Sequence, residues 1–176
     1  LGKRNYNSYL TRSVDRTVTL AERAEIAEKI KADFFLSVHV NASEANEPRG
    51  FETYYLDNHQ DSAIKKVESV ENKNLEGEEL IVNKILTDLV IDRTVKSSKP
   101  LAQSIHSRIQ KLVGRKYKLK DRGVKPGLFY VLALTKRPAI LLEVGFLSNS
   151  RELKKILDEK FQNRYAKAVA QGLDDY

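Results

Sequence analysis

Two continuous apolar runs, each carrying one polar side chain suited to catalysis, constrain the fold of this chain most. The first run covers residues 34–43, Phe-Phe-Leu-Ser-Val-His-Val-Asn-Ala-Ser, and carries His39 near its end. The second run, Pro138–Asn149, carries Glu143 in the same way. Apolar runs of about four to eight residues are typical of strands covered on both faces, and open α/β sheets bind ligands outside the carboxyl ends of their strands. A histidine and a glutamate at one edge of the sheet predict metal-assisted hydrolysis.

Helical patterns alternate with strand patterns along most of the chain. Strands are predicted at residues 6–12, 34–39, 50–56, 129–132 and 138–143. Helices are predicted at residues 19–30, 60–75, 78–91, 99–113, 150–158 and 160–173. The first helix is amphipathic, with Thr17 or Thr19 as its cap, and Pro100 suits the first turn of another helix. This alternation predicts an α/β fold of three layers, with a mostly parallel sheet flanked by helices on both faces.

Length and composition narrow the class of protein. The chain has 176 residues, which is enough for one domain and too few to expect two. It contains no apolar stretch near the roughly 18 residues that would suggest a membrane span. Cysteine is absent, so any metal must be held by His, Asp or Glu.

The net charge of +7 favours an anionic partner, such as nucleic acid, anionic lipid or an acidic cell-wall polymer. Most basic residues are interleaved with acids, and only Lys111–Arg122 forms a dense cluster. We interpret this cluster as a solvated helix end and loop. Alternatively, it helps the protein to stay on an anionic matrix.

Several sequence blocks, in order and spacing, resemble one known family over nearly the whole chain. The blocks are Leu10–Asp15, Leu20–Arg23, Ala32–Ala42, Gly50–Tyr55, Ile85–Leu89, Ser98 with Leu101–Ala102, Gly123–Lys125, Phe129–Leu132 and Pro138–Asn149. Together they resemble the zinc-dependent N-acetylmuramoyl-L-alanine amidases, the peptidoglycan amidases of the AmiA, AmiB and AmiC kind. The resemblance implies a zinc-exopeptidase-like fold and a location in the cell envelope, periplasmic or extracellular, with a role in cell division.

The resemblance also implies the reaction and the roles of two residues. Such amidases use a zinc-activated water to cut the amide between N-acetylmuramic acid and the L-alanine of the stem peptide. Zn²⁺ has His, Glu and His as its protein ligands, and a late glutamate serves as general base and acid. By position, His39 matches the later histidine ligand and Glu143 matches the catalytic glutamate.

The start of the chain departs from the family pattern. In the family, a Gly-His-Gly loop and a helix carrying the ligand glutamate precede the Leu-Thr-Arg block. Only ten residues precede Thr11 here, and none of them is His, Asp or Glu. We therefore expect the further His and Glu ligands upstream of Leu1, so that residues 1–176 form a single amidase catalytic domain that is incomplete at its N-terminus. The fragment alone is then expected to be inactive without those ligands.

For individual residues the sequence leaves structural alternatives open. His39 could be a strand-end histidine bonded to its loop, and Glu143 could form a salt bridge with Arg137 or Arg122. An unpaired buried carboxylate is costly, which favours a catalytic or metal-linked role. Asn41 lies on the same side of the strand as His39 and could orient a ligand or cap the loop.

The remaining polar candidates have simpler interpretations. Arg12 and Asp15 could touch substrate, although an internal ion pair that holds the loop is the alternative. His59 lies in a polar turn and His106 on a helix among polar neighbours. Neither has the spacing of a metal-binding pair, so we expect ordinary roles for both.

The segment Ser62–Glu79 suggests regulation. In some relatives, an insertion at this point folds over the zinc and blocks it until an activator protein binds. The acidic stretch Ser69–Glu79 predicts a short lid, with Glu76, Glu78 or Glu79 as the autoinhibitory contact. The alternative is a plain connector between two helices.

Two other functions compete with the hydrolase. A non-catalytic amidase-like domain could bind peptidoglycan or a cell-division partner, and the ligands missing before Thr11 favour it. A nucleic-acid-binding domain rests on net charge alone, because the chain has no glycine-rich phosphate loop and no recognisable recognition helix. We therefore predict peptidoglycan as the substrate, a possible activator protein, no nucleic acid, no membrane span and a monomer.

Overall fold

A mixed sheet forms the middle layer of the molecule. The computed structural model describes residues 6–43, 48–72 and 78–176, and the sheet orders its four strands as β1-β4-β2-β3. The strands are β1 (Phe35–Asn41), β2 (Phe51–Leu56), β3 (Asp121–Gly127) and β4 (Ala139–Phe146). β1 runs parallel to β4 and β3 parallel to β2, whereas β2 and β4 are antiparallel. The sheet is therefore mostly parallel, as predicted.

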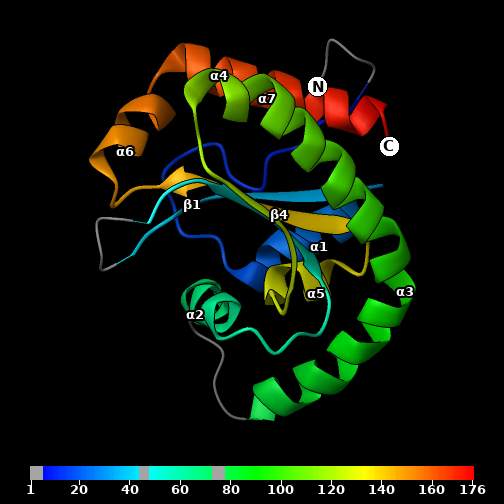
Figure 1. Cartoon of the computed structure of the whole chain (residues 1–176). Coiled ribbons are helices and arrows are strands. Elements are labelled where there is room, and N and C mark those ends of the chain that lie inside the picture. The colour runs from blue at the N-terminus through cyan, green and yellow to red at the C-terminus, as the bar shows by residue number, and fades with distance from the viewer. Residues whose placement is uncertain (1–5, 44–47, 73–77) are drawn as a thin grey trace.

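Helices cover both faces of this sheet (Figure 1). They are α1 (Leu20–Lys29), α2 (Ser62–Glu71), α3 (Glu78–Ile109), the π-helix η2 (Gln110–Gly114), α4 (Arg115–Tyr117), α5 (Tyr130–Thr135), α6 (Ser150–Ile156) and α7 (Glu159–Asp174). Helices α1, α2 and α5 lie on one side, and α4 and α7 lie on the other (Figure 1). None of the helices described is both long and apolar enough to cross a bilayer.

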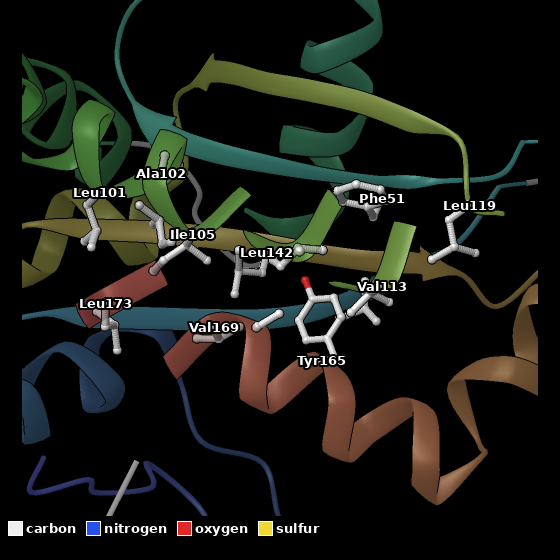
Figure 2. Packing of buried hydrophobic residues seen from close by; sticks show 14 of the residues in the cluster. Phe51, Leu101, Ala102, Ile105, Val113, Leu119, Leu142, Tyr165, Val169 and Leu173 are labelled. Atoms are coloured by element: carbon white, nitrogen blue, oxygen red, sulfur yellow. The ribbon is translucent and has the colours of Figure 1, made fainter. Parts of the chain in front are cut away.

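The larger hydrophobic core lies between the sheet and the pair α3–α7. Its members come from alternate positions of β4 and β2, the second half of α3, and one face of α7 (Figure 2). Leu101, Ile105 and Ile109 of α3 are fully buried there against Leu142 of β4. The four-residue spacing of these α3 side chains places them on one helix face, which packs on the sheet.

A second core fills the opposite face. It combines Phe35 of β1, Tyr54 of β2 and Leu141 of β4 with side chains of α1, α2 and α5. Because strand side chains alternate, β4 supplies Leu141 to this core and Leu142 to the other. The continuous apolar run of β4 is therefore the sequence of a strand buried on both faces.

Helix α1 begins as the sequence predicts. The Thr19 side chain accepts a hydrogen bond from the Glu22 backbone N–H at 3.1 Å, and the Glu22 carboxylate accepts one from the Thr19 N–H at 2.7 Å. This reciprocal pair is a capping box, which satisfies two backbone donors at the helix start. Thr19, and not Thr17, is thus the cap.

The predicted break between residues 91 and 99 is wrong. Helix α3 continues through Pro100, which lies inside the helix and does not begin it. Proline in a helix interior removes one hydrogen bond and costs about 3 kcal/mol. Burial of Leu101 and Ala102 immediately after it, each fully inaccessible, offsets that cost.

Three short segments also differ from the prediction. Residues 129–132 were expected to be a strand, yet they begin α5, because a short apolar run does not distinguish a strand from a buried helix. Strand β3 was missed because Asp-Arg-Gly-Val-Lys-Pro-Gly has little strand character and lies at an edge of the sheet. Residues 6–10 form no regular element, contrary to the strand expected at 6–12.

Candidate metal and catalytic site

Three polar side chains line up across neighbouring strands at one end of the sheet. His39 of β1 is the register partner of Glu143 of β4, and Glu143 is also paired with Glu52 of β2. Each of the three lies two or four residues along its own strand from a member of the second core. Because side chains alternate between the two faces of a strand, all three point to the face of the sheet that carries α2. The sequence prediction that His39 and Glu143 meet at one edge agrees with this register.

Helix α2 adds a second carboxylate to this row. Glu71 is its last residue, and its Oε2 lies 2.7 Å from His39 Nδ1. The other ring nitrogen of His39, Nε2, is 2.9 Å from the Ser37 hydroxyl. One ligand atom each from His39, Glu71 and Glu143 lie within 4.8 Å of one another. A cluster of this size is suited to one cation.

Glu143 is the most unusual member of the cluster. Its side chain is fully buried, and neither carboxylate oxygen has a hydrogen-bond partner among the residues described. Burial first, and then the charges of Glu71 and Glu52, together raise the pKa of Glu143 to about 8. A buried carboxylate without a partner is stable only when it is protonated or faces a cation.

The salt bridges considered for Glu143 are absent from the described structure, because both arginines have other partners. Arg137 donates to the Ala32 carbonyl at 2.7 Å and to Glu28 Oε2 at 3.1 Å. Arg122 donates through Nε to Glu52 Oε2 at 3.0 Å. In the described structure, neither arginine therefore pairs with the Glu143 carboxylate.

Glu52 pairs with two cationic side chains at this end of the sheet. Its Oε2 accepts hydrogen bonds from Arg122 and, at 2.6 Å, from Lys125 Nζ, while the Glu52 side chain is only 1% exposed. Asn41 donates to Glu52 Oε1 at 3.5 Å, so among the described residues its side chain contacts the neighbouring carboxylate. A single acid within the β-forming run Phe51–Leu56 was a signal for Glu52 that the sequence reasoning overlooked.

The remaining histidines lie outside the cluster and have internal partners. His59 Nε2 is 2.5 Å from Glu68 Oε1. His106 is buried, with Nδ1 at 2.9 Å from the Thr53 hydroxyl and Nε2 at 2.8 Å from Asp121. It therefore connects α3 to β2 and β3.

Arg12 of the N-terminal loop and the glutamates of the predicted lid lie outside the cluster or outside the described residues, with the exception of Glu71. Arg12 donates to the Arg16 carbonyl at 2.9 Å and so braces its own loop. Glu76 lies outside the described residues, and Glu78 and Glu79 open α3 with side chains outside them as well. Their role as autoinhibitory contacts stays a prediction. From the same predicted segment, Glu71 is the residue that reaches His39.

The donor set fits zinc. Zn²⁺ in proteins is bound by His nitrogen and by Asp or Glu oxygen, and the cluster offers one imidazole and two carboxylates. Among the described residues neither oxygen of Glu143 has a hydrogen-bond partner, so both are available to a cation. The chemistry of the residues present thus supports a divalent cation next to His39.

Comparison with known proteins places the chain in a family. Residues 1–175 match the family described as N-acetylmuramoyl-L-alanine amidase. N-acetylmuramoyl-L-alanine amidase AmiA of Escherichia coli (strain K12) is 28% identical over 176 residues, covering 95% of this chain and 60% of that protein. The chain spans between 26% and 64% of the length of three curated relatives that it matches.

Solved structures give the same result. The catalytic domain of CwlV, an N-acetylmuramoyl-L-alanine amidase from Bacillus (Paenibacillus) polymyxa var. colistinus, is 32% identical with a TM-score of 0.66, over 96% of this chain and 70% of that one. The CwlD amidase of Clostridioides difficile, solved in complex with the GerS lipoprotein, is 26% identical with a TM-score of 0.67, over 96% and 74%. These likenesses confirm the predicted α/β fold.

Proposed function

Because the chain belongs to the N-acetylmuramoyl-L-alanine amidase family, we propose that it supplies catalytic residues of a peptidoglycan hydrolase. The substrate is the amide between N-acetylmuramic acid and the L-alanine of the stem peptide, and the protein works in the cell envelope. One observation carries this proposal. A histidine and a buried, unpartnered glutamate are register partners on adjacent strands, His39 and Glu143, within reach of one cation.

In this proposal His39 is a zinc ligand and Glu143 is the proton carrier. When bound, zinc supplies positive charge that polarises the scissile carbonyl and lowers the pKa of water toward about 7. The family resemblance implies two further ligands, a His and a Glu, in addition to His39. Glu143 then remains free of the ligand set, with its oxygens facing the site.

Glu143 performs the acid–base work. It accepts a proton from the attacking water and returns it to the amine of the leaving L-alanine. A catalytic acid–base group works best when its pKa is near the operating pH, and burial raises the pKa of Glu143 to about 8. The strand pairing on both sides of β4 holds this carboxylate in one position.

The test is a comparison of Glu143→Gln with His39→Ala in the full-length protein. Glu143→Gln is expected to keep bound zinc and to lose about 10² to 10⁴ in rate, the usual contribution of a general acid–base. His39→Ala is expected to lose both zinc and activity. Metal content by mass spectrometry and release from sacculi of stem peptide with a new N-terminal L-alanine are the measurements, with the exposed Glu25→Gln on α1 as control.

Two outcomes would contradict the proposal. Full activity of Glu143→Gln would remove its catalytic role. A wild-type protein that binds sacculi and cleaves nothing would favour the alternative, a non-catalytic domain that binds peptidoglycan or a cell-division partner.

Helix α2 supports a second proposal, that the protein is autoinhibited through Glu71. Oε2 of Glu71 lies 2.7 Å from His39 Nδ1, at the position where a cation or substrate would otherwise approach. The helix end is pinned by Asn72, whose side chain donates to the Leu128 carbonyl at 2.7 Å and accepts from the Tyr130 N–H at 3.0 Å. A partner protein that draws α2 away from β1 would expose the site and activate the enzyme.

Replacing Glu71 tests this second proposal. Glu71→Gln is expected to raise turnover several-fold without a partner and to keep or raise the zinc content, because it removes the carboxylate that competes with a cation or substrate at His39. Kinetics on soluble muramoyl peptides and metal analysis are the measurements. Loss of zinc together with activity would instead make Glu71 a metal ligand and contradict autoinhibition.

A further inference from the structure

A strongly basic cavity lies next to the candidate site. It has a volume of about 790 Å³ and opens where β4 ends and β3 begins. Six cationic side chains line it: Arg49, Lys118, Lys120, Arg122, Arg151 and Lys155. They come from the segment before β2, the segment before β3 and the start of β3, and from α6, so the fold gathers them from distant parts of the sequence.

The positive charge of this cavity is largely uncompensated. The single carboxylate in its lining is Glu152, which is buried and directed to the backbone. Its oxygens accept the N–H groups of Gly50 at 2.7 Å and Phe146 at 3.0 Å. Within the described part of the chain, no carboxylate contacts the four exposed cations, namely Arg49, Lys118, Lys120 and Arg151.

The cavity and the candidate site share one edge of the sheet. His39 and Glu143 lie toward the ends of β1 and β4, and Ser148–Glu152, which follow β4, line the cavity. Arg122 belongs to both, since it lines the cavity and binds Glu52, the register partner of Glu143. Strands are spaced about 4.8 Å apart, so β3 lies roughly 10 Å from Glu143 across β2.

We infer that this cavity binds carboxylate groups of the stem peptide that continues beyond the scissile amide. This inference rests on the proposed function. An extended peptide advances about 3.4 Å per residue, so about three residues span the roughly 10 Å between Glu143 and β3, the strand that brings Arg122 to the cavity. Arg and Lys bind carboxylates through charge-assisted hydrogen bonds, and several of them around an open cavity concentrate an acidic ligand.

The same geometry assigns a function to part of the basic cluster Lys111–Arg122. Lys118, Lys120 and Arg122 line the cavity, whereas Arg115 and Lys116 lie on α4 and do not. Both pairs, Lys118 with Lys120 and Arg115 with Lys116, are exposed. The cluster thus offers two pairs of cations that differ in position and not in charge.

These pairs provide a matched experiment on the full-length enzyme. The test variant is Lys118→Gln with Lys120→Gln, and the control is Arg115→Gln with Lys116→Gln, which removes the same charge outside the cavity. Two soluble muramoyl peptides serve as substrates. They share one stem peptide, whose carboxyl groups are free in one and converted to carboxamides in the other.

We expect the wild-type enzyme to prefer the acidic peptide through a lower KM. The test variant should raise KM for that peptide roughly tenfold, which corresponds to about 1.4 kcal/mol for the two lost charge-assisted contacts together. Its kcat should change less than about twofold, and the carboxamide peptide should be cleaved as before. The control variant should match the wild type on both substrates.

Three results would distinguish a failure of this inference from a failure of the proposed function. Equal KM values of wild type for the two peptides, or a preference that survives in the test variant, would overturn the inference and leave the amidase function intact. Cleavage of neither peptide by any form would contradict the proposed function first. A test variant that keeps the peptide preference but loses binding to inorganic polyphosphate would assign the cavity to a phosphate-bearing polymer, which also overturns the inference.

Discussion

At the scale of single residues, the burial of Glu143 decides most of the chemistry. Its carboxylate is inaccessible, has no hydrogen-bond partner in the described structure, and lies near the carboxylates of Glu71 and Glu52. Such a group favours the protonated form until a cation arrives. Burial of this carboxylate therefore costs folding stability when no cation faces it.

This cost predicts how the metal-free protein responds to pH. The pKa of Glu143 in the folded state is about 8, above the ordinary value of 4.5 for this side chain, so the folded state binds more protons between these pH values. The free energy of unfolding should then fall as pH rises from about 4.5 to 8, by up to about 1.4 kcal/mol per pH unit. Urea unfolding of chelator-treated protein at several pH values is the measurement.

Glu143→Gln is the comparison for this prediction. The amide does not titrate, so the variant should lose the fall in stability that the wild type shows over the same interval. Parallel curves for the two proteins would mean that Glu143 titrates near its ordinary pKa.

The sequence predicted part of this site and missed the rest for a physical reason. His39 and Glu143 lie within apolar runs that form two paired parallel strands, so their proximity followed from local pattern. Glu71 reaches His39 only because α2 packs over β1, a tertiary contact that no local pattern encodes. Glu52 was within reach of sequence reasoning, because it alternates with Tyr54 on β2.

At the scale of elements, the close contact between α3 and α7 holds the larger core together. Gly172 of α7 faces Ile105 of α3, and a Cβ at Gly172 would lie 2.4 Å from the Ile105 Cα. Ser104 donates to the Gly172 carbonyl at 2.7 Å across the same contact. The absence of a side chain at this position thus sets the distance between the two helices.

Gly172→Ala should therefore destabilise the protein. In an open helix this change gains about 1 kcal/mol, but here the methyl group meets backbone atoms and the helices must separate. We expect a net loss of about 1–3 kcal/mol, as for overpacked cores. Chemical denaturation followed by circular dichroism measures it, and an unchanged or higher stability would show that the helices move apart freely.

Element prediction failed where local sequence and tertiary context disagree. Pro100 signals a helix boundary, but burial of the residues after it keeps α3 continuous. Strand β3 contains two glycines and a proline and is held by its pairing with β2. The helices α1, α6 and α7, whose amphipathic pattern and caps agree with their environment, were predicted to within two residues.

At the scale of the whole molecule, β4 joins the two cores into one structure. It pairs with β1 on one side and β2 on the other, and its successive side chains enter opposite cores. Leu141 and Leu142 are both fully inaccessible. A substitution that destabilises the core on one face of β4 should thus also destabilise the core on the other face.

Truncation on either face tests this coupling. Leu141→Ala and Leu142→Ala should each lower the free energy of unfolding by about 2–5 kcal/mol, since both leave a cavity. Each variant should still unfold in one transition, with far-ultraviolet circular dichroism and tyrosine absorbance changing together. Two separate transitions in either variant would show that the cores are independent.

The central position of β4 in the sheet also predicts how the enzyme loses activity on heating. Glu143 is held by a strand that is bonded on both edges and covered on both faces, so it has no local way to loosen. Heat inactivation and the melting of the entire molecule should then share one midpoint temperature. A shelf-stable preparation would be obtained by strengthening either face of the sheet, even far from the reacting atoms.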